Sequence, residues 1–281
     1  MNQEDRTALL DWYRALGVDA ILDERPRDWF ASPAETELME ITGMERSPAV
    51  APQPRVAPKP LATTETKPAT RPVTPQRLVP PQEAEMAARE LARKAASLTE
   101  LEALAASFDG CGLKATASKL CFARGRHDAA LMMIGEAPGR DEDMRGVPFV
   151  GRAGQLLDRM IAAIGLAPDD AYITNLVFWR PPGNRTPTPQ EVQSCQPFVE
   201  RQIELVRPKV LVFLGAAAAK QLTGASDGIM KLRGRWLGYG EGRTRAIATL
   251  HPAYLLRNPL AKRLAWRDLL KIRAALDGEA D

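Results

Sequence analysis

The sequence predicts an α/β protein, a three-layer α/β/α sandwich built on a central four-stranded parallel sheet. Short apolar runs that end in Gly or a polar residue alternate with helical segments along residues 131–276. Strands that alternate with helices are typical of a parallel sheet covered on both faces. A hydrophobic content of 45% is sufficient for such a core. We expect one folded domain over residues 83–281.

The elements follow from local patterns. The expected strands are Leu131–Gly135, Tyr172–Asn175, Val210–Gly215 and Ala246–His251. The expected helices have apolar residues at helical spacing or are rich in Ala, and they cover 83–106, 153–164, 189–206, 216–222 and 262–276. In parallel sheets, ligands bind beyond the carboxyl ends of the strands. The polar residues at those ends, Glu136, Asn175 and His251, should therefore border one crevice.

The chain before this domain differs in composition. Residues 4–17 have apolar residues at helical spacing, which predicts a short amphipathic helix within an N-terminal appendage of residues 1–45. Residues 46–82 are rich in Pro, and such a segment buries too little apolar surface to offset its ordering entropy. We expect a disordered Pro-rich linker. The helix either docks a protein partner or has no partner.

Composition excludes several classes of protein. No apolar run approaches the roughly 20 residues that span a bilayer, and the N-terminus lacks the basic and apolar regions of a secretory signal. Three Cys in 281 residues do not form a disulfide framework. Residues 91–281 carry an excess of basic residues, which is compatible with a polyanionic partner. We expect a monomer in the bacterial cytoplasm, associated with the nucleoid.

The first group of candidate site residues follows the strand at 131–135. The segment Gly135-Glu-Ala-Pro-Gly139 precedes several acidic residues and a second glycine-containing segment that ends at Gly151. Glu136 and Glu142 lie in this acidic group, and carboxylates in one cleft can shift one another's pKa and act in acid/base chemistry. The alternative is a solvated loop or a helix cap. The glycines match neither the P-loop nor the dinucleotide fingerprint.

The second group lies around Asn175. Its amide offers a donor and an acceptor, which fits the N3–H/O4 edge of a pyrimidine, although an Asn at this position can also cap a turn. Arg180 and Arg185 flank a rigid Pro-Pro-Gly turn and could hold phosphates, or they could simply be solvated.

The third group begins at His251, one of only two histidines. An imidazole at the end of a strand can stabilise negative charge that develops on a carbonyl oxygen, or it can be a core residue. Tyr254, Leu255 and Leu256 are large groups beside a loop. They could wedge into a base stack, or they could form the first turn of a buried helix.

Together these groups resemble the family-4 branch of the uracil-DNA glycosylase superfamily. Its members show a GE(A/G)PG loop, PFVGRAGQLL, YI-x-N, RPP-x-NR-TPTP-x-E and HP-x-YLLR, and all are present here in order within residues 108–276. The resemblance implies an enzyme that flips uracil out of DNA and hydrolyses its N-glycosidic bond. Residues 1–85 lie outside it.

The resemblance also implies a role for each matching residue in binding uracil. Phe149 would stack on the extruded base, Asn175 would read its edge, and Asn184 would shape the pocket. Ala137 stands where many relatives in other branches place an Asp, so the general base is left open.

The same resemblance implies which residues act in catalysis and which contact DNA. Glu136 and Glu142 would hold or polarise the attacking water, and His251 would stabilise the departing anion. The segment from Tyr254 to Arg257 would lie in the minor groove.

Family-4 members bind a [4Fe-4S] cluster through four Cys. The matching positions here are Phe108, Cys111, Trp179 and Cys195, and Cys121 is the candidate for a third thiolate. Such a cluster normally takes four thiolates. Two alternatives stay open for this site: either a cluster is bound, or Phe108 and Trp179 fill the space by apolar packing.

One sub-branch cross-links to its product through a His on an inserted loop. Residues 176–185 contain neither a His nor an insertion, so we expect hydrolysis with turnover. The alternative functions are a catalytically silent DNA-binding module and a glycosylase for another deaminated base.

Overall fold

The computed structural model describes residues 80–240 and 244–279. The predicted N-terminal helix and almost all of the Pro-rich linker lie outside these residues, so both stay predictions. Within the described ranges, no helix combines the length and the hydropathy needed to cross a membrane.

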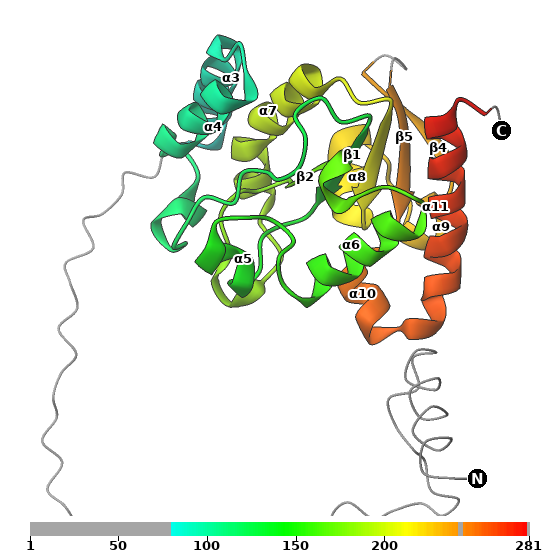
Figure 1. The fold of residues 1–281 in the computed structure, drawn as a ribbon. Coiled ribbons are helices and arrows are strands. Elements are labelled where there is room, and N and C mark those ends of the chain that lie inside the picture. The colour runs from blue at the N-terminus through cyan, green and yellow to red at the C-terminus, as the bar shows by residue number, and fades with distance from the viewer. Residues whose placement is uncertain (1–79, 241–243, 280–281) are drawn as a thin grey trace, which may run out of the picture. The chain divides into compact units, whose positions relative to one another are not determined.

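A five-stranded sheet forms the centre of the fold, with strand order β2-β1-β3-β5-β4 (Figure 1). The four predicted strands are present and mutually parallel: β1 (Leu131–Gly135), β2 (Ala171–Asn175), β3 (Val210–Leu214) and β5 (Thr244–Thr249). The predicted α/β class is confirmed. The prediction of four strands missed the edge strand β4 (Trp236–Tyr239), which is antiparallel to β5. β4 is short, contains Gly238 and is only partly buried, so it lacks the apolar run of the other strands.

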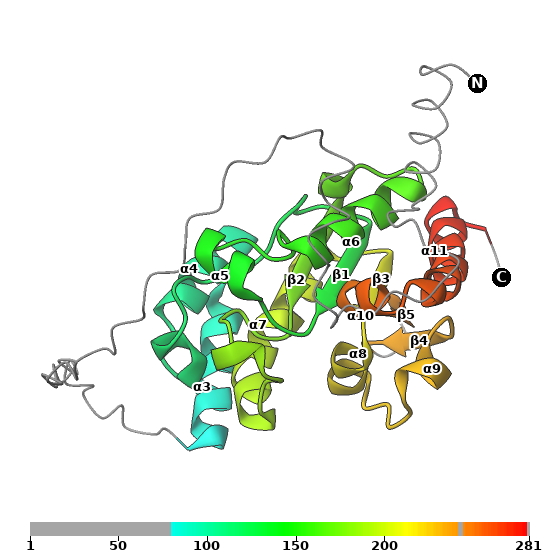
Figure 2. The ribbon, with the colours of Figure 1, turned by 90° about the horizontal axis from the view of Figure 1, so that it is seen from below.

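Helices cover both faces of the sheet (Figures 1 and 2). The core on one face includes buried residues of α3 (Pro81–Lys94), α4 (Leu98–Ser107), α7 (Pro189–Val206) and α8 (Ala216–Thr223), and α3 joins it by packing on α7. The other packs against α6 (Arg152–Ala163), α10 (Pro252–Arg257) and α11 (Lys262–Asp277). Alternate strand residues supply the two cores, because neighbouring side chains on a strand point to opposite faces. Thus Met132 and Ile134 belong to the first core, and Leu131 and Met133 to the second.

The single helix predicted for residues 83–106 is wrong, because the chain forms two helices there. A break at residues 95–97 separates α3 from α4. Ser97 is the N-cap of α4, and its hydroxyl accepts a hydrogen bond from the backbone N–H of Glu100 at 3.2 Å. The Glu100 carboxylate accepts from the N–H of Ala96 at 2.8 Å. These bonds satisfy donors at the start of a helix, so they favour a new helix over continuation.

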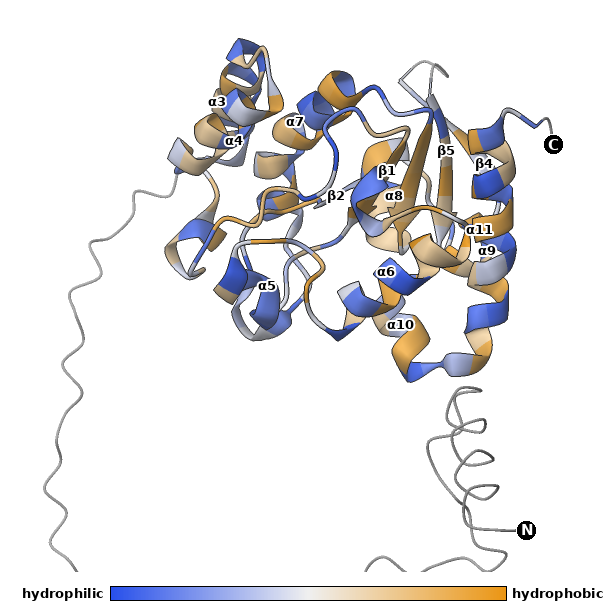
Figure 3. Cartoon of the chain, in the orientation of Figure 1, coloured by the Kyte–Doolittle hydropathy of each residue, from blue (hydrophilic) through white to orange (hydrophobic). Residues whose placement is uncertain are grey.

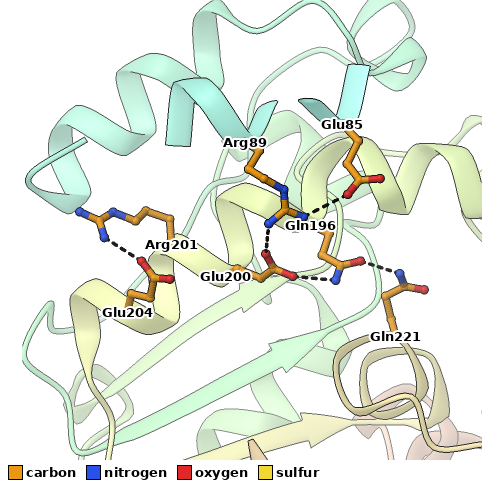
Figure 4. Close-up of polar contacts among 7 residues, drawn as sticks. All are labelled: Glu85, Arg89, Gln196, Glu200, Arg201, Glu204 and Gln221. Carbon is orange, nitrogen blue, oxygen red and sulfur yellow. Dashed lines mark hydrogen bonds and ion pairs between the residues drawn. The ribbon is translucent and has the colours of Figure 1, made fainter. Parts of the chain in front are cut away.

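Helix α7 joins α3 to α8 through polar contacts around Glu200 (Figure 4). Its carboxylate accepts from Arg89 of α3 at 3.2 Å and from Gln196 at 2.7 Å, and Gln196 accepts from Gln221 of α8 at 2.7 Å. Partly exposed pairs of this kind contribute little stability. The apolar contact beneath them holds α3 in place, through its buried residues Ala84, Ala88 and Ala92.

A buried ion pair joins α11 to the end of β5. The Asp268 side chain accepts hydrogen bonds from Thr249 Oγ1 at 2.7 Å and from Arg233 Nε at 3.1 Å, and Arg233 Nη2 also donates to it. Burial raises the pKa of Asp268, and the bonds from Thr249 and Arg233 oppose this shift. Thr249 lies two residues before His251, so the pair fixes the strand end from which the third candidate group follows.

Replacing Asp268 with Ala would leave the Arg233 guanidinium, whose side chain is 15% exposed, without its carboxylate. We expect the free energy of unfolding to fall by about 3–5 kcal/mol, because an unpaired buried charge is strongly destabilising. Urea unfolding followed by circular dichroism measures it. The control, Asp277→Ala, breaks a more exposed pair with Arg273 on the same helix and should change stability by about 0.5 kcal/mol or less. Equal losses in the two variants would contradict this role.

Candidate functional site

A cleft of about 470 Å³ lies at the carboxyl ends of the parallel strands. Glu136 follows β1, Asn175 ends β2 and His251 follows β5, and all three line the cleft, as the strand pattern predicted. The other predicted site residues that line it are Ala137, Glu142, Phe149, Asn184, Arg185, Tyr254 and Arg257. The structure therefore gathers most of the predicted residues around one cavity.

Asn175 carries an unpaired acceptor at the cleft. Its side chain is buried, with the residue 1% exposed, and Oδ1 has no hydrogen-bond partner in the part of the chain that the structure describes. Buried polar atoms are nearly always hydrogen-bonded, and an exception is energetically unfavourable. The arrangement is therefore ready for a ligand that supplies a donor.

The absence of a side chain at Gly135 makes this arrangement possible. Gly135 pairs with Asn175 across β1 and β2. A Cβ at Gly135 would lie 2.4 Å from Asn175 Oδ1 and 2.5 Å from Phe149 Cζ. Both distances are far below contact distance, so only glycine allows the amide and the ring to meet here.

Phe149 lies in an unusual backbone conformation. Its φ is 56°, and its side chain is buried. Non-glycine residues rarely adopt this region, so the surrounding structure must hold it. Gly154 of α6 does so by close approach, because a Cβ there would fall 1.7 Å from the Phe149 carbonyl oxygen. The ring centroid lies 5.7 Å from that of His251, with the planes tilted by 33°.

The two predicted catalytic carboxylates differ in their surroundings. Glu142 accepts backbone hydrogen bonds from Gly139 (3.1 Å), Val150 (2.9 Å) and Gly151 (2.8 Å). It therefore ties the first loop to the loop that carries Phe149, and both of its oxygens are occupied. Glu136 lines the cleft, and its side chain makes no hydrogen bond to another described residue.

His251 is fixed as a hydrogen-bond donor. It is the N-cap of α10, and its Nδ1 accepts from the backbone N–H of Ala253 at 3.1 Å. A neutral imidazole with an accepting Nδ1 carries its proton on Nε2. Burial, and to a smaller extent the positive charge of Arg257, lower the pKa of His251 to about 4. The ring is thus neutral near pH 7 and offers an N–H without a positive charge.

The predicted residues of the second group have separate environments. Arg180 does not line the cleft, and its Nε donates to Asn184 Oδ1 at 2.7 Å. Asn184 itself has a positive φ of 56°, so this bond helps to hold a turn. Arg185 lines the cleft and pairs with both oxygens of Glu191 at 2.7 and 2.9 Å.

The residues predicted to contact DNA differ in how exposed they are to solvent. Tyr254 and Leu256 are 38% and 37% exposed, and Arg257 is exposed as well. Leu255 is 1% exposed and packs in the second core. Its apolar side chain therefore stabilises α10 and does not face solvent.

The candidate cluster ligands do not form a four-thiolate site. Cys111 and Cys195 lie next to each other, and the interaction between the two thiols lowers the pKa of Cys111, whereas burial raises the pKa of Cys195. Cys121 lies elsewhere, since its Sγ donates to the carbonyl oxygen of Glu142 at 3.2 Å. Within residues 80–240 and 244–279, no three His, Cys, Asp or Glu residues are grouped to hold a metal ion.

Aromatic packing occupies the other two ligand positions. Phe108 is 4% exposed, and its ring centroid lies 5.4 Å from that of Phe198. Trp179 is 3% exposed and packs edge-on against Phe178, with the two ring centroids 6.2 Å apart. Both belong to the same apolar core as Cys111 and Cys195. The residues present therefore do not fit a [4Fe-4S] cluster.

Sequence reasoning missed several residues of the cleft wall. These are Pro138, Gly139, Ala153, Pro181, Thr186 and Ala253. Most of them carry no polar side chain, and they contribute shape and backbone groups. In the sequence, they could have been identified only by their position inside the segments that carry the predicted residues.

Comparison with known proteins agrees with the geometry. A family model described as the Uracil DNA glycosylase superfamily matches residues 122–270. The chain is 41% identical over 172 residues to a type-4 uracil-DNA glycosylase of Archaeoglobus fulgidus, which covers 58% of this chain and 84% of the relative. It is 40% identical over 175 residues to a protein of the same name from Thermotoga maritima, covering 60% and 89%.

The state of His251 can be measured directly. Its pKa of about 4 is below the ordinary value of 6.5, so the neutral form should persist in the folded protein down to about pH 4. The contribution of this residue to stability should then fall as the pH drops from 6.5 towards 4, because only the unfolded chain binds the proton there. A proton NMR titration of the imidazoles tests this, and His127→Asn assigns the two signals. A His251 signal that titrates near 6.5 would contradict the burial argument.

Proposed function

We propose, on the premise that this chain belongs to the type-4 branch of the uracil-DNA glycosylase superfamily, that it removes uracil from DNA. The reaction hydrolyses the N-glycosidic bond of an extruded deoxyuridine and leaves an abasic site, the first step of base excision repair. The chain matches 84% and 89% of the length of the two relatives described above.

The unpaired oxygen of Asn175 is the observation that carries this proposal. Uracil presents an N3–H donor beside an O4 acceptor, and a side-chain amide complements that pair. Cytosine presents an acceptor at N3 and an amino donor beside it. In the same orientation, the Asn175 oxygen would face the N3 acceptor and the Asn175 amino group would face the amino donor. A buried amide that cannot pair with the wrong base discriminates strongly. The ring of Phe149 would provide the surface on which the base stacks.

We assign the chemical step to two residues. The departing base develops negative charge, and the neutral His251 donates a hydrogen bond to the O2 carbonyl on which that charge gathers. Glu136 orients the attacking water towards the sugar. Its carboxylate also stabilises the positive charge that develops on the sugar as the bond breaks. Glu142 acts by holding the two loops together, a positioning role. Asn184 and Ala137 shape the pocket. Arg257, which also lines the cleft, contacts a phosphate of the DNA, and Arg185 does so only in addition to its pair with Glu191.

A silent DNA-binding module is the weaker candidate. A chain that had lost the reaction would be free to lose the amide, the imidazole or the carboxylate, and all three line one cleft here. A glycosylase for another base is also less favoured, because the relatives are named as uracil-DNA glycosylases. Monomeric state, cytoplasmic location and a protein partner for residues 1–45 stay predictions.

Replacing Asn175 with Asp keeps the size of the side chain and removes its donor. We expect kcat/KM for uracil excision to fall by about 100-fold or more, because a carboxylate next to O4 is repelled and cannot donate. The measurement uses a uracil-containing oligonucleotide, followed by alkaline cleavage of abasic sites. Thermal unfolding and binding to undamaged DNA serve as controls for folding. A variant that keeps full activity and selectivity would show that Asn175 does not read the base.

We propose that Phe108 and Trp179 replace the cluster by apolar packing. Protein purified without oxygen should then contain far less than the four iron atoms per chain of a [4Fe-4S] cluster, and it should lack thiolate-to-iron absorption at about 400 nm. The double variant Phe108→Cys/Trp179→Cys restores the four-thiolate set and should gain iron on anaerobic reconstitution. The matched control, Phe178→Cys/Trp179→Cys, has the same number of thiols. Four irons in the unaltered protein would overturn the proposal.

A further inference from the structure

We propose that Arg124 is a positioning residue for uracil binding. Its guanidinium holds the peptide that precedes Phe149, and its backbone is paired with the strand that ends at Asn175. This inference rests on the proposed function, and it identifies what keeps the stacking ring and the base-reading amide aligned. Arg124 is not among the residues that line the cleft, so it acts through Phe149 and not by contact with the base.

The backbone of Arg124 lies along the outer edge of β2. Its N–H donates to the Ile173 carbonyl at 3.0 Å, and its carbonyl accepts from the Ile173 N–H at 2.9 Å. Gly125 allows this close approach, because a Cβ there would fall 1.7 Å from the Ala171 carbonyl oxygen. The backbone of Arg124 is therefore fixed opposite a residue that lies two positions before Asn175 on the same strand.

The side chain of Arg124 reaches from this edge to the loop that carries Phe149. Its Nε donates to the Pro148 carbonyl oxygen at 3.1 Å, and its Nη2 pairs with the Asp158 carboxylate of α6. The Arg124 side chain is only 14% exposed. Hydrogen bonds from a charged donor are stronger than neutral ones, and more so where water is excluded. One guanidinium thus joins the strand edge, the loop and α6.

Helix α6 contacts the same loop in a second way. Figure 3 shows both hydrophobic and hydrophilic residues along this helix, which buries Leu157 and leaves the Asp158 side chain 36% exposed. Gly154 of the helix packs against the Phe149 carbonyl, as described above. The helix therefore meets the loop directly at Gly154 and indirectly through the pair between Asp158 and Arg124.

The backbone conformation of Phe149 depends on the two peptides that flank it. Each peptide unit is planar and rigid, so the orientations of the two units set φ and ψ of the residue between them. Arg124 holds the first unit at the Pro148 carbonyl. Glu142 holds the second unit through the N–H of Val150, at 2.9 Å. With both units held, the uncommon φ of 56° is maintained.

The hydrogen bond to Pro148 therefore bears on where the Phe149 ring meets the base. A loop without it would relax towards commoner backbone angles and would move the ring away from its contacts at Gly135 and Asn175. A base stacked on a displaced ring would present its edge to Asn175 at a poorer angle. Misplacement by about 1 Å can lower a rate about 100-fold.

A salt bridge that only stabilises the fold is the alternative role for Arg124. It predicts a loss of stability that has no particular link to the Phe149 ring. The positioning role predicts that the effect of Arg124 on activity requires that ring. The two roles therefore differ in how substitutions at the two positions combine.

Arg124→Gln removes the charge and the two-point contact but keeps a polar side chain. We expect kcat/KM for uracil excision to fall about 10- to 100-fold, inhibition by free uracil to weaken by a similar factor, and binding to undamaged duplex to stay unchanged. The matched control is Arg126→Gln in the same segment, because the Arg126 side chain is 57% exposed and pairs with Asp128 at the surface. It should change each quantity by about 2-fold or less.

A double-mutant cycle separates the two roles. Phe149→Ala leaves no ring to position, so adding Arg124→Gln to it should lower kcat/KM by about 3-fold or less. An equal loss in both backgrounds would overturn the proposal. If Arg124→Gln does not fold, Asp158→Ala replaces it in the cycle, because this change frees the guanidinium from α6 and leaves β2 untouched. It should show the same dependence on Phe149 with a smaller loss.

A second readout needs no catalysis and so separates this inference from the proposed function. The Phe149 ring centroid lies 5.7 Å from that of His251, so the ring current of Phe149 shifts the imidazole proton signals. Phe149→Ala gives the shift for complete loss of the ring. Arg124→Gln should move the His251 signals part of the way to that position, and Arg126→Gln should not.

The outcomes for the two proposals are distinct. Unaltered protein that excises no uracil from any DNA substrate would refute the proposed function alone. His251 signals that stay unchanged in Arg124→Gln would refute the positioning role of Arg124, whatever the activity.

Discussion

The close approach of Gly135, Asn175 and Phe149 is the constraint on which the cleft depends. The three groups come from the ends of β1 and β2 and from the loop before α6, and they meet only because position 135 lacks a side chain. The backbone strain at Phe149 is part of the same arrangement, since Gly154 and Glu142 hold the loop that bears it. The shape of this part of the cleft is thus set by packing.

The sequence predicted the features that depend on local pattern. The four parallel strands have continuous apolar runs, and their polar ends identified Glu136, Asn175 and His251. Features that depend on tertiary contact could not be predicted in this way. β4 is paired only through its neighbour β5, and it has no apolar run of its own.

The roles of single residues within the motifs needed the structure for the same reason. Glu136 and Glu142 are carboxylates of one segment and both line the cleft. Only the structure shows that Glu142 ties two loops through backbone hydrogen bonds, whereas the side chain of Glu136 makes no hydrogen bond to another described residue. Leu255 and Leu256 are adjacent and identical in type, yet one is 1% exposed and the other 37%.

The unpaired amide oxygen of Asn175 also has a consequence for the molecule at rest. A buried acceptor without a partner among the described residues lowers the free energy of unfolding by about 1–3 kcal/mol relative to a satisfied or apolar group. Proteins commonly retain such a deficit where function requires it, at the expense of thermal robustness. The excised base can make up the deficit after reaction, so the free product would rigidify the enzyme and compete with the next damaged strand.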